Sequence, residues 1–191
     1  MKYFLILTLA TLACGFASPK SNFIPASSLP TPVPAQDTIS APTGPTPNPI
    51  AEQIKNARYR LGARDDHLIV QLVDGKYDSG TDPAATGYAS IRLLDKMAYG
   101  DLNSDGVGDA AVLVAENYGG SGTFASLVIF LNVDGKFVQS ASTLIDDRPI
   151  IESLSIGMGA IGLSATTHNF KDPMCCPTLH TAQIYQFSDG R

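Results

Sequence analysis

Apolar residues recur along the chain in short runs, most of which mix with polar residues and are separated by Gly, Pro, Asp or Asn. These runs occupy residues 68–73, 89–98, 110–115, 124–133, 150–156, 160–166 and 181–187. Their spacing and their content of β-branched and aromatic residues predict an all-β domain. We expect an antiparallel meander that forms a sandwich or an open barrel, with a short helix over residues 50–56 at its edge.

One run differs from the others because it does not alternate cleanly. Residues 124–133 include an unbroken apolar stretch from Leu127 to Leu131. Such a strand has apolar side chains on both of its faces, since successive side chains point to opposite sides of a sheet. We therefore predict a central strand that is covered on both faces.

Glycines mark three predicted tight turns. Asp74-Gly75 and Asp134-Gly135 each stand between a valine and a lysine, and Asp-Gly suits the positive φ angles of a hairpin turn. They predict two hairpins of one meander. The glycine-rich stretch 157–162 formally matches the dinucleotide fingerprint G-x-G-x-x-G, which requires a helix after it. The residues that follow are strand-like, so we reject a nucleotide site and expect a hairpin between Ile156 and Ile161.

The first 49 residues predict an export signal followed by a linker. Lys2, an apolar run over residues 3–12 and the small residues after it are typical of an export signal over residues 1–17. Cys14 follows Thr-Leu-Ala, which resembles a bacterial lipobox, so lipidation of Cys14 and cleavage after Ala17 are both open, and we favour lipidation. Residues 18–49 hold nine of the thirteen prolines and predict a disordered Pro-rich linker. The expected location is the bacterial cell envelope (lipid-anchored, periplasmic or surface) or the medium after secretion.

Residues 50–191 suit a single domain by length. They carry eleven Lys/Arg against seventeen Asp/Glu, a formal net charge of −6. Nucleic acid is excluded as a partner, because phosphates require a basic footprint. Contact with a membrane is expected only through a lipid at the N-terminus.

The segment 101–109 carries the clearest candidate chemistry. Side-chain oxygens stand at its first, third, fifth and ninth positions, namely Asp101, Asn103, Asp105 and Asp109. Ca²⁺ takes six to eight oxygen ligands, and its loops place them on alternate residues around a glycine, here Gly106, with a main-chain carbonyl at the seventh position, here Val107. We expect Ca²⁺ at this loop. An EF-hand is excluded, because its twelfth position requires Glu and is Val112 here.

This loop resembles the calcium loop of FG-GAP-type repeats, in which D-x-N-x-D-G-x-x-D joins two β-strands. The chain after residue 50 also resembles a group of uncharacterised bacterial secreted proteins and lipoproteins. The matching segments are residues 99–115, 117–124, 147–148 and 172–177. The resemblance implies a strand on each side of the loop, and it implies no activity.

Cys175 and Cys176 are the other candidate site. If Cys14 is acylated or removed, they are the only two thiols left, and in an oxidising envelope they can pair only with each other or stay free. Adjacent Cα atoms lie closer than in most disulfides, so a bond between these cysteines would be strained and easily reduced. A metal site that adds His168 and His180 matches no common zinc spacing. We favour a structural thiol pair or a vicinal disulfide, and a redox or metal role remains an alternative. His67 is expected to be a solvated surface residue.

The loop from Gly119 to Thr123 supports a hydrolase as a second alternative, with Ser121, Glu116 or His168 as participants. Ser121 lacks the G-x-S-x-G pattern of a nucleophile elbow. A flexible hairpin connection or a ligand-contact loop explains the same residues. The favoured function is therefore a non-enzymatic, envelope-displayed β-domain, stabilised by calcium, which binds an unknown protein or envelope polymer or has a structural role.

Overall fold

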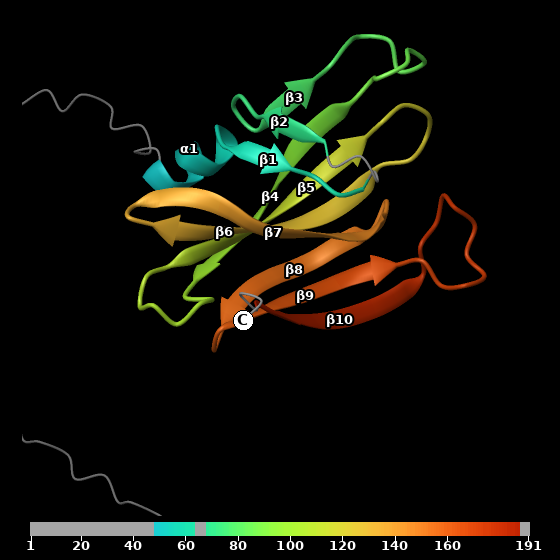
Figure 1. Ribbon diagram of the computed structural model, residues 1–191. Helices are drawn as coiled ribbons and strands as arrows, with labels where there is room; N and C mark the ends of the chain where they lie inside the picture. Colours follow the sequence, from blue (N-terminus) through green and yellow to red (C-terminus); the bar gives the residue numbers. More distant parts are fainter. Residues whose placement is uncertain (1–47, 64–67, 188–191) are drawn as a thin grey trace, which may run out of the picture. The chain divides into compact units, whose positions relative to one another are not determined.

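The computed structural model describes residues 48–63 and 68–187, which belong to the compact unit 44–191 (Figure 1). The predicted export signal, the lipidation of Cys14 and nearly all of the predicted linker lie outside the described residues, and so does His67. No helix among the described residues is long and apolar enough to cross a membrane.

The described residues are mainly β-structure, and the fold class is confirmed. The elements are α1 (Pro49–Lys55), β1 (Arg58–Arg60), β2 (Ile69–Gln71), β3 (Lys76–Asp78), β4 (Ser90–Gly100), β5 (Asp109–Asn117), β6 (Phe124–Val133), β7 (Lys136–Asp147), β8 (Ile150–Gly157), β9 (Ala160–Thr167) and β10 (Leu179–Gln186).

The strands form three antiparallel sheets, one of which is curved as a half-barrel. The largest has the order β3-β4-β5-β6-β7, the second has the order β10-β9-β8, and β1 pairs with β2 alone. Each strand of the two larger sheets pairs with its neighbour in sequence, as a meander requires. The predicted helix is α1, which Asn48 caps by accepting the N–H of Ile50. The apolar runs did not reveal β1, β3 or β7.

The tight turns have the predicted backbone. Asp134 and Gly135 both have positive φ, 52° and 81°, and join β6 to β7. Met158 and Gly159 do the same between β8 and β9, which confirms the hairpin around the glycine-rich stretch. Asp74 and Gly75 also have positive φ, but the turn leads from β2 to β3, which lie in different sheets and share only the bridge between Val73 and Lys76. Val73 and Lys76 exchange both main-chain hydrogen bonds, at 2.9 and 3.0 Å, so the predicted hairpin turn is confirmed. The prediction that it belongs to one meander is wrong, because the strands before and after it lie in different sheets.

The five-stranded sheet has an apolar core on each face. On β5 the even-numbered residues from Ala110 to Val114 face α1, β1 and β2, while Ala111 and Leu113 face β8 and β9. On β6, Val128 and Phe130 join the first core, and Leu127 and Ile129 join the second. The prediction that β6 is a central strand covered on both faces is confirmed.

The two larger sheets approach each other closely where β4 ends. A Cβ atom added to Gly100 would lie 2.5 Å from Cγ2 of Ile156 on β8. Only glycine therefore fits at this point, which immediately precedes the candidate calcium loop. The loop leaves the fold from a fixed position between the two sheets.

Candidate functional site

The loop 101–109 connects β4 to β5, which are paired from Gly100 and Asp109 onward. It thus joins two strands, as the resemblance implies. The Asp101 carboxylate accepts the N–H of Ser104 at 2.7 Å and the N–H of Gly106 at 3.0 Å. Ser104 and Gly106 have positive φ, 64° and 83°, so the loop curls around the Asp101 carboxylate.

Asn103 and Asp105 also form hydrogen bonds within this loop. Oδ1 of Asn103 accepts the N–H of Asp105 at 3.2 Å, and its Nδ2 donates to Oδ2 of Asp105 at 2.8 Å. Asp105 in turn accepts the N–H of Val107 at 2.7 Å. Each bonded oxygen has two lone pairs and uses one of them for these contacts, so hard oxygen donors remain for a cation.

Asp109 is placed differently from the other three. Its side chain is fully buried, and its two oxygens accept the N–H groups of Leu102 at 2.9 Å and of Asn132 at 3.0 Å. It therefore ties the first part of the loop to the end of β6. Within residues 48–63 and 68–187, no group of three His, Cys, Asp or Glu side chains is close enough to hold a metal ion. Carboxylate and amide oxygens, as Asp101, Asn103 and Asp105 supply them, are the ligand type that Ca²⁺ prefers.

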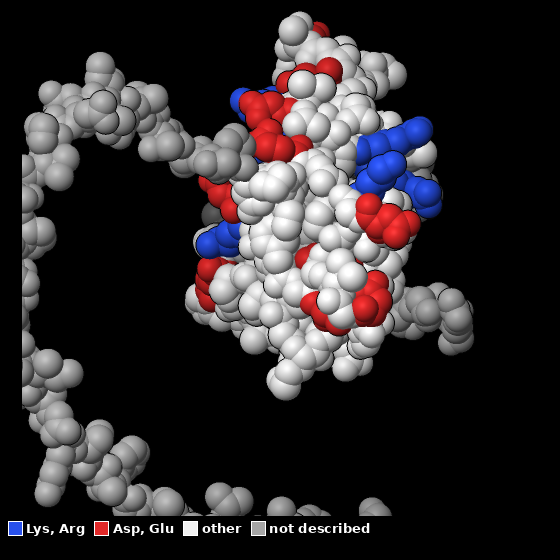
Figure 2. Space-filling view, turned by 90° about the vertical axis from the view of Figure 1, so that its left-hand side faces the viewer, with Lys and Arg blue, Asp and Glu red and all other residues white. Residues whose placement is uncertain are grey.

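The face of the domain in Figure 2 carries small groups of acidic and of basic side chains, with wide uncharged areas between them. No extended basic surface appears on this face.

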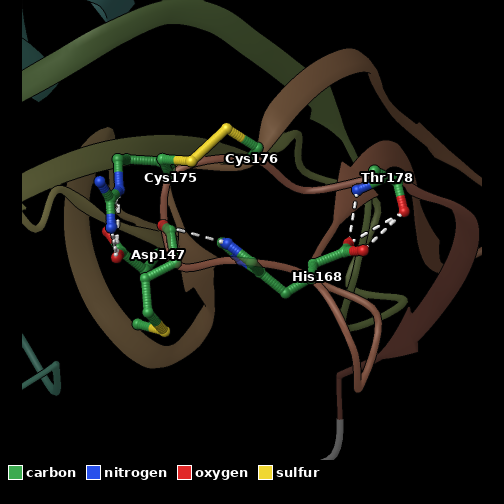
Figure 3. The surroundings of a disulfide bond; sticks show 8 residues. Asp147, His168, Cys175, Cys176 and Thr178 are labelled. Carbon is green, nitrogen blue, oxygen red and sulfur yellow. Dashed lines mark hydrogen bonds and ion pairs between the residues drawn. A yellow bond between two sulfur atoms is a disulfide. The ribbon is translucent and has the colours of Figure 1, made fainter.

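Cys175 and Cys176, the candidate pair, are joined by a disulfide (Figure 3). Both residues are exposed, in the loop between β9 and β10. The loop is held by Asp172, which accepts the N–H groups of Asn169 at 2.8 Å and of Thr178 at 2.7 Å. The Asn169 contact, with help from Thr178 and against a smaller effect of burial, lowers the pKa of Asp172.

His168 connects this loop to the end of β7. Its Nδ1 lies 3.0 Å from Oδ2 of Asp146, and its Nε2 lies 3.2 Å from the carbonyl oxygen of Met174, beside the disulfide. The hydrogen bond with Asp146 is the main reason why the pKa of His168 is raised. His180, the other histidine considered for a metal site, instead contacts Glu152 and Thr166, so the described residues do not gather the four proposed ligands.

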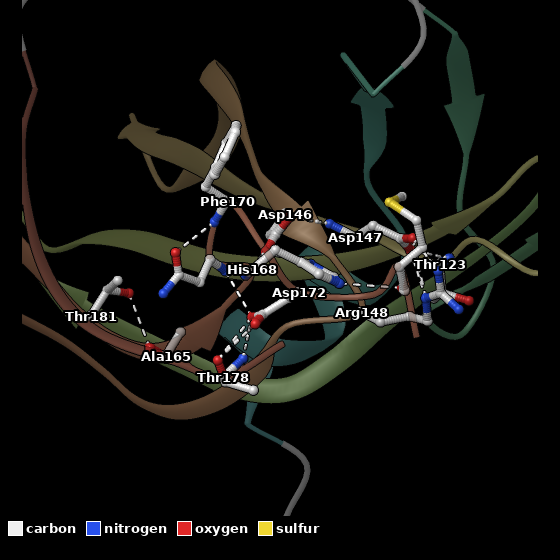
Figure 4. Close-up of polar contacts among 12 residues, drawn as sticks. Thr123, Asp146, Asp147, Arg148, Ala165, His168, Phe170, Asp172, Thr178 and Thr181 are labelled. Carbon is white, nitrogen blue, oxygen red and sulfur yellow. Dashed lines mark hydrogen bonds and ion pairs between the residues drawn. The ribbon is translucent and has the colours of Figure 1, made fainter. Parts of the chain in front are cut away.

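A partly buried ion pair lies next to His168, at the turn after β7 (Figure 4). Asp147 accepts the N–H of Thr123 at 2.8 Å and pairs with the Arg148 guanidinium at 2.5 Å. Burial opposes ionisation of Asp147, but the Arg148 and Thr123 contacts outweigh it and leave the pKa of Asp147 below its usual value. Arg148 also donates its own N–H to the Thr123 carbonyl at 2.7 Å. This end of the 119–123 loop is thus fixed to β7.

Among the described residues, no hydrogen bond joins the three residues proposed for hydrolysis, Ser121, Glu116 and His168. Ser121 forms no hydrogen bond within the described part of the chain. Glu116 is fully buried on β5 and accepts hydrogen bonds from the hydroxyls of Ser126 and Tyr118. His168 belongs to the network with Asp146.

Two contacts of this site had no signal in the sequence. Asp146 and His168 are 22 positions apart, and Glu152 lies at a bulge of β8 that turns it toward Ser164 and Thr166 on β9. Both contacts depend on which strands lie next to each other in the fold, and local sequence patterns do not reveal this. The Asp147-Arg148 pair was part of a segment quoted for the resemblance, but its partner Thr123 was not predicted.

Comparisons of the chain with protein-family models, with curated proteins and with solved structures find no match.

Proposed function

We propose that this protein is a non-enzymatic β-domain of the cell envelope or the extracellular medium, in which Ca²⁺ rigidifies the loop between β4 and β5. The observation that carries the proposal is the loop itself. Its oxygen-bearing side chains all bond within the loop or to the strand ends next to it, and each bonded oxygen retains a lone pair. The proposed ligands are Asp101, Asn103, Asp105, Asp109 and the carbonyl of Val107.

Calcium has a physical reason to stabilise this loop. Three carboxylates lie within nine residues in a domain of net negative charge, and their mutual repulsion opposes the folded state. One of them, Asp109, is fully buried and is balanced by two main-chain N–H groups rather than by a basic side chain of the described part of the chain. A divalent cation would reduce the repulsion and fix the ends of two adjacent strands.

Thermal unfolding of the full chain with and without calcium tests the proposal. A ligand that binds only the folded state at about 100 times its dissociation constant stabilises it by about 2.7 kcal/mol. We expect millimolar Ca²⁺ to raise the melting temperature, and Asp101→Ala combined with Asp105→Ala to abolish the increase. Asp95→Ala, which removes an exposed carboxylate of β4, is the control and should keep it. An identical melting curve of the wild type in calcium and in chelator would reject the calcium site.

A further inference from the structure

The two-stranded sheet and the five-stranded sheet meet along a seam between β1 and β7 (Figure 1). Among the described residues, β7 is the last strand of its sheet and β1 pairs only with β2, so each has one edge without a described strand partner. Main-chain bonds from Leu61 and to Ala57 join β1 to β2. Because direction alternates along an antiparallel strand, the main-chain groups of Arg58 and Arg60 face the other way, toward β7.

Glutamine side chains bridge this seam in place of a strand. Gln139 on β7 accepts the N–H of Arg60 at 2.6 Å and donates to its carbonyl at 2.7 Å. Gln53 on α1 donates to the carbonyl of Gly135 at 3.2 Å and accepts the N–H of Phe137 at 3.4 Å. A carboxamide has the donor and acceptor groups of a peptide unit. The hydrogen-bonding pattern of the seam is therefore the one that a peptide strand would satisfy.

Two adjacent cavities open along the same seam. Their volumes are about 490 and 450 Å³, and both are lined by Arg58, Val138 and Gln139. Arg60 lines the first cavity and Lys136 the second, and among the described residues, 48–63 and 68–187, no Asp or Glu lines either. The seam is thus basic in a domain with a net negative charge.

We propose that the seam between β1 and β7 binds an extended peptide segment with acidic side chains. The peptide main chain pairs with the outward groups of Arg58 and Arg60 and takes the place of the Gln139 carboxamide, a form of β-strand addition. It also replaces the Ser142 hydroxyl, which donates to the carbonyl of Arg60 at 3.2 Å. Acidic side chains of the peptide meet the two guanidinium groups, which bind carboxylates in two-point contacts. Arg58 and Arg60 lie on the same face of β1, with Tyr59 buried on the other. This binding site is independent of the calcium loop.

Fluorescence anisotropy tests the proposal with a labelled ten-residue peptide of alternating Glu and Val, titrated with the full chain in calcium and in chelator. We expect saturable binding under both conditions. Arg58→Gln and Arg60→Gln should each weaken it about tenfold, as loss of a charge-assisted hydrogen bond does. Lys96→Gln is the matched control, since it removes one exposed positive charge from β4, and should change nothing. Absence of binding at about 1 mM peptide, or an equal loss in the Lys96 variant, would overturn the site.

Two further measurements separate peptide addition from attraction by charge alone. Gln139→Ala removes the side chain that competes with the peptide, so the peptide should bind more tightly to this variant. A circular dichroism melt checks that the variant is folded, and Ser140→Asp, which adds a negative charge to the cavity wall, should weaken binding without removing the bridge. An acidic polysaccharide of uronate units that displaces the peptide at equal charge concentration would refute the peptide assignment, and so would weaker binding to folded Gln139→Ala.

Discussion

Replacing Asp109 with asparagine removes one charge and one acceptor oxygen while keeping the shape of the side chain. The two carboxylate oxygens accept N–H groups from Leu102 and from Asn132, and the side chain is fully buried. In asparagine one of these oxygens becomes an NH₂ group, which faces a main-chain N–H without an acceptor between them. The loss of a hydrogen bond to a charged group, with a buried donor left unpaired, costs about 2 kcal/mol.

This cost corresponds to a fall in melting temperature of about 5–10 °C for a domain of this size. The melts should be recorded by calorimetry in chelator, so that the main-chain contacts of Asp109 are measured apart from any metal. Asp105→Asn is the control, because Asp105 is exposed and its amide can still accept the N–H of Val107. A melting temperature of Asp109→Asn that equals that of Asp105→Asn would show that the carboxylate does not tie the loop to β6.

Three other changes test the contacts between elements. Gly100→Ala should destabilise the domain by about 1–3 kcal/mol in a denaturant titration, because its Cβ would lie 2.5 Å from Cγ2 of Ile156, whereas Gly108→Ala, with nothing within 4 Å, should have little effect. The hydrogen bond with Asp146 raises the pKa of His168, so its stabilisation is complete below the unfolded pKa of about 6.5 and is lost as pH rises through the folded pKa. His168→Gln should therefore lower the melting temperature at pH 5.5 and less at pH 9, and an equal loss at both would contradict the pairing. Since Cys175 and Cys176 are bonded and exposed, mass spectrometry of the proteolytic fragment that contains them should find both residues alkylated after treatment with a dithiol and neither without it. Labelling of this fragment before reduction would contradict the bond.

The features that the sequence could predict are those encoded within about ten residues. The unbroken apolar run from Leu127 to Leu131 predicted that β6 is buried on both faces. The glycines after Asp134 and Met158 predicted the two turns. The disulfide could be weighed because its two cysteines are adjacent. The candidate calcium loop is local in the same sense, since its proposed ligands share one segment.

The strands that the apolar runs did not reveal have weak local signals for physical reasons, although the Asp134-Gly135 turn did indicate that a strand follows it. β1 and β3 are three residues each, too short for a period to be recognised. β7 is long, but it is an edge strand with mostly exposed or half-buried residues, many of them Ser, Thr or Gln. An edge strand needs no continuous apolar face, so its pattern resembles that of a polar loop.

Long-range contacts need the strand order as well as the strands. Gln139 and Arg60 are 79 positions apart, yet both main-chain groups of Arg60 bond to that one side chain. In the sequence, Gln139 is a polar residue among others of a weak strand, typical of a solvated edge. It becomes the closing contact between two sheets only because β1 lies beside β7, and the same position makes it the group that a bound peptide must displace. The Gln139→Ala variant therefore tests the fold and the binding proposal at once: a lower melting temperature would confirm the bridge, and tighter peptide binding would confirm its replacement.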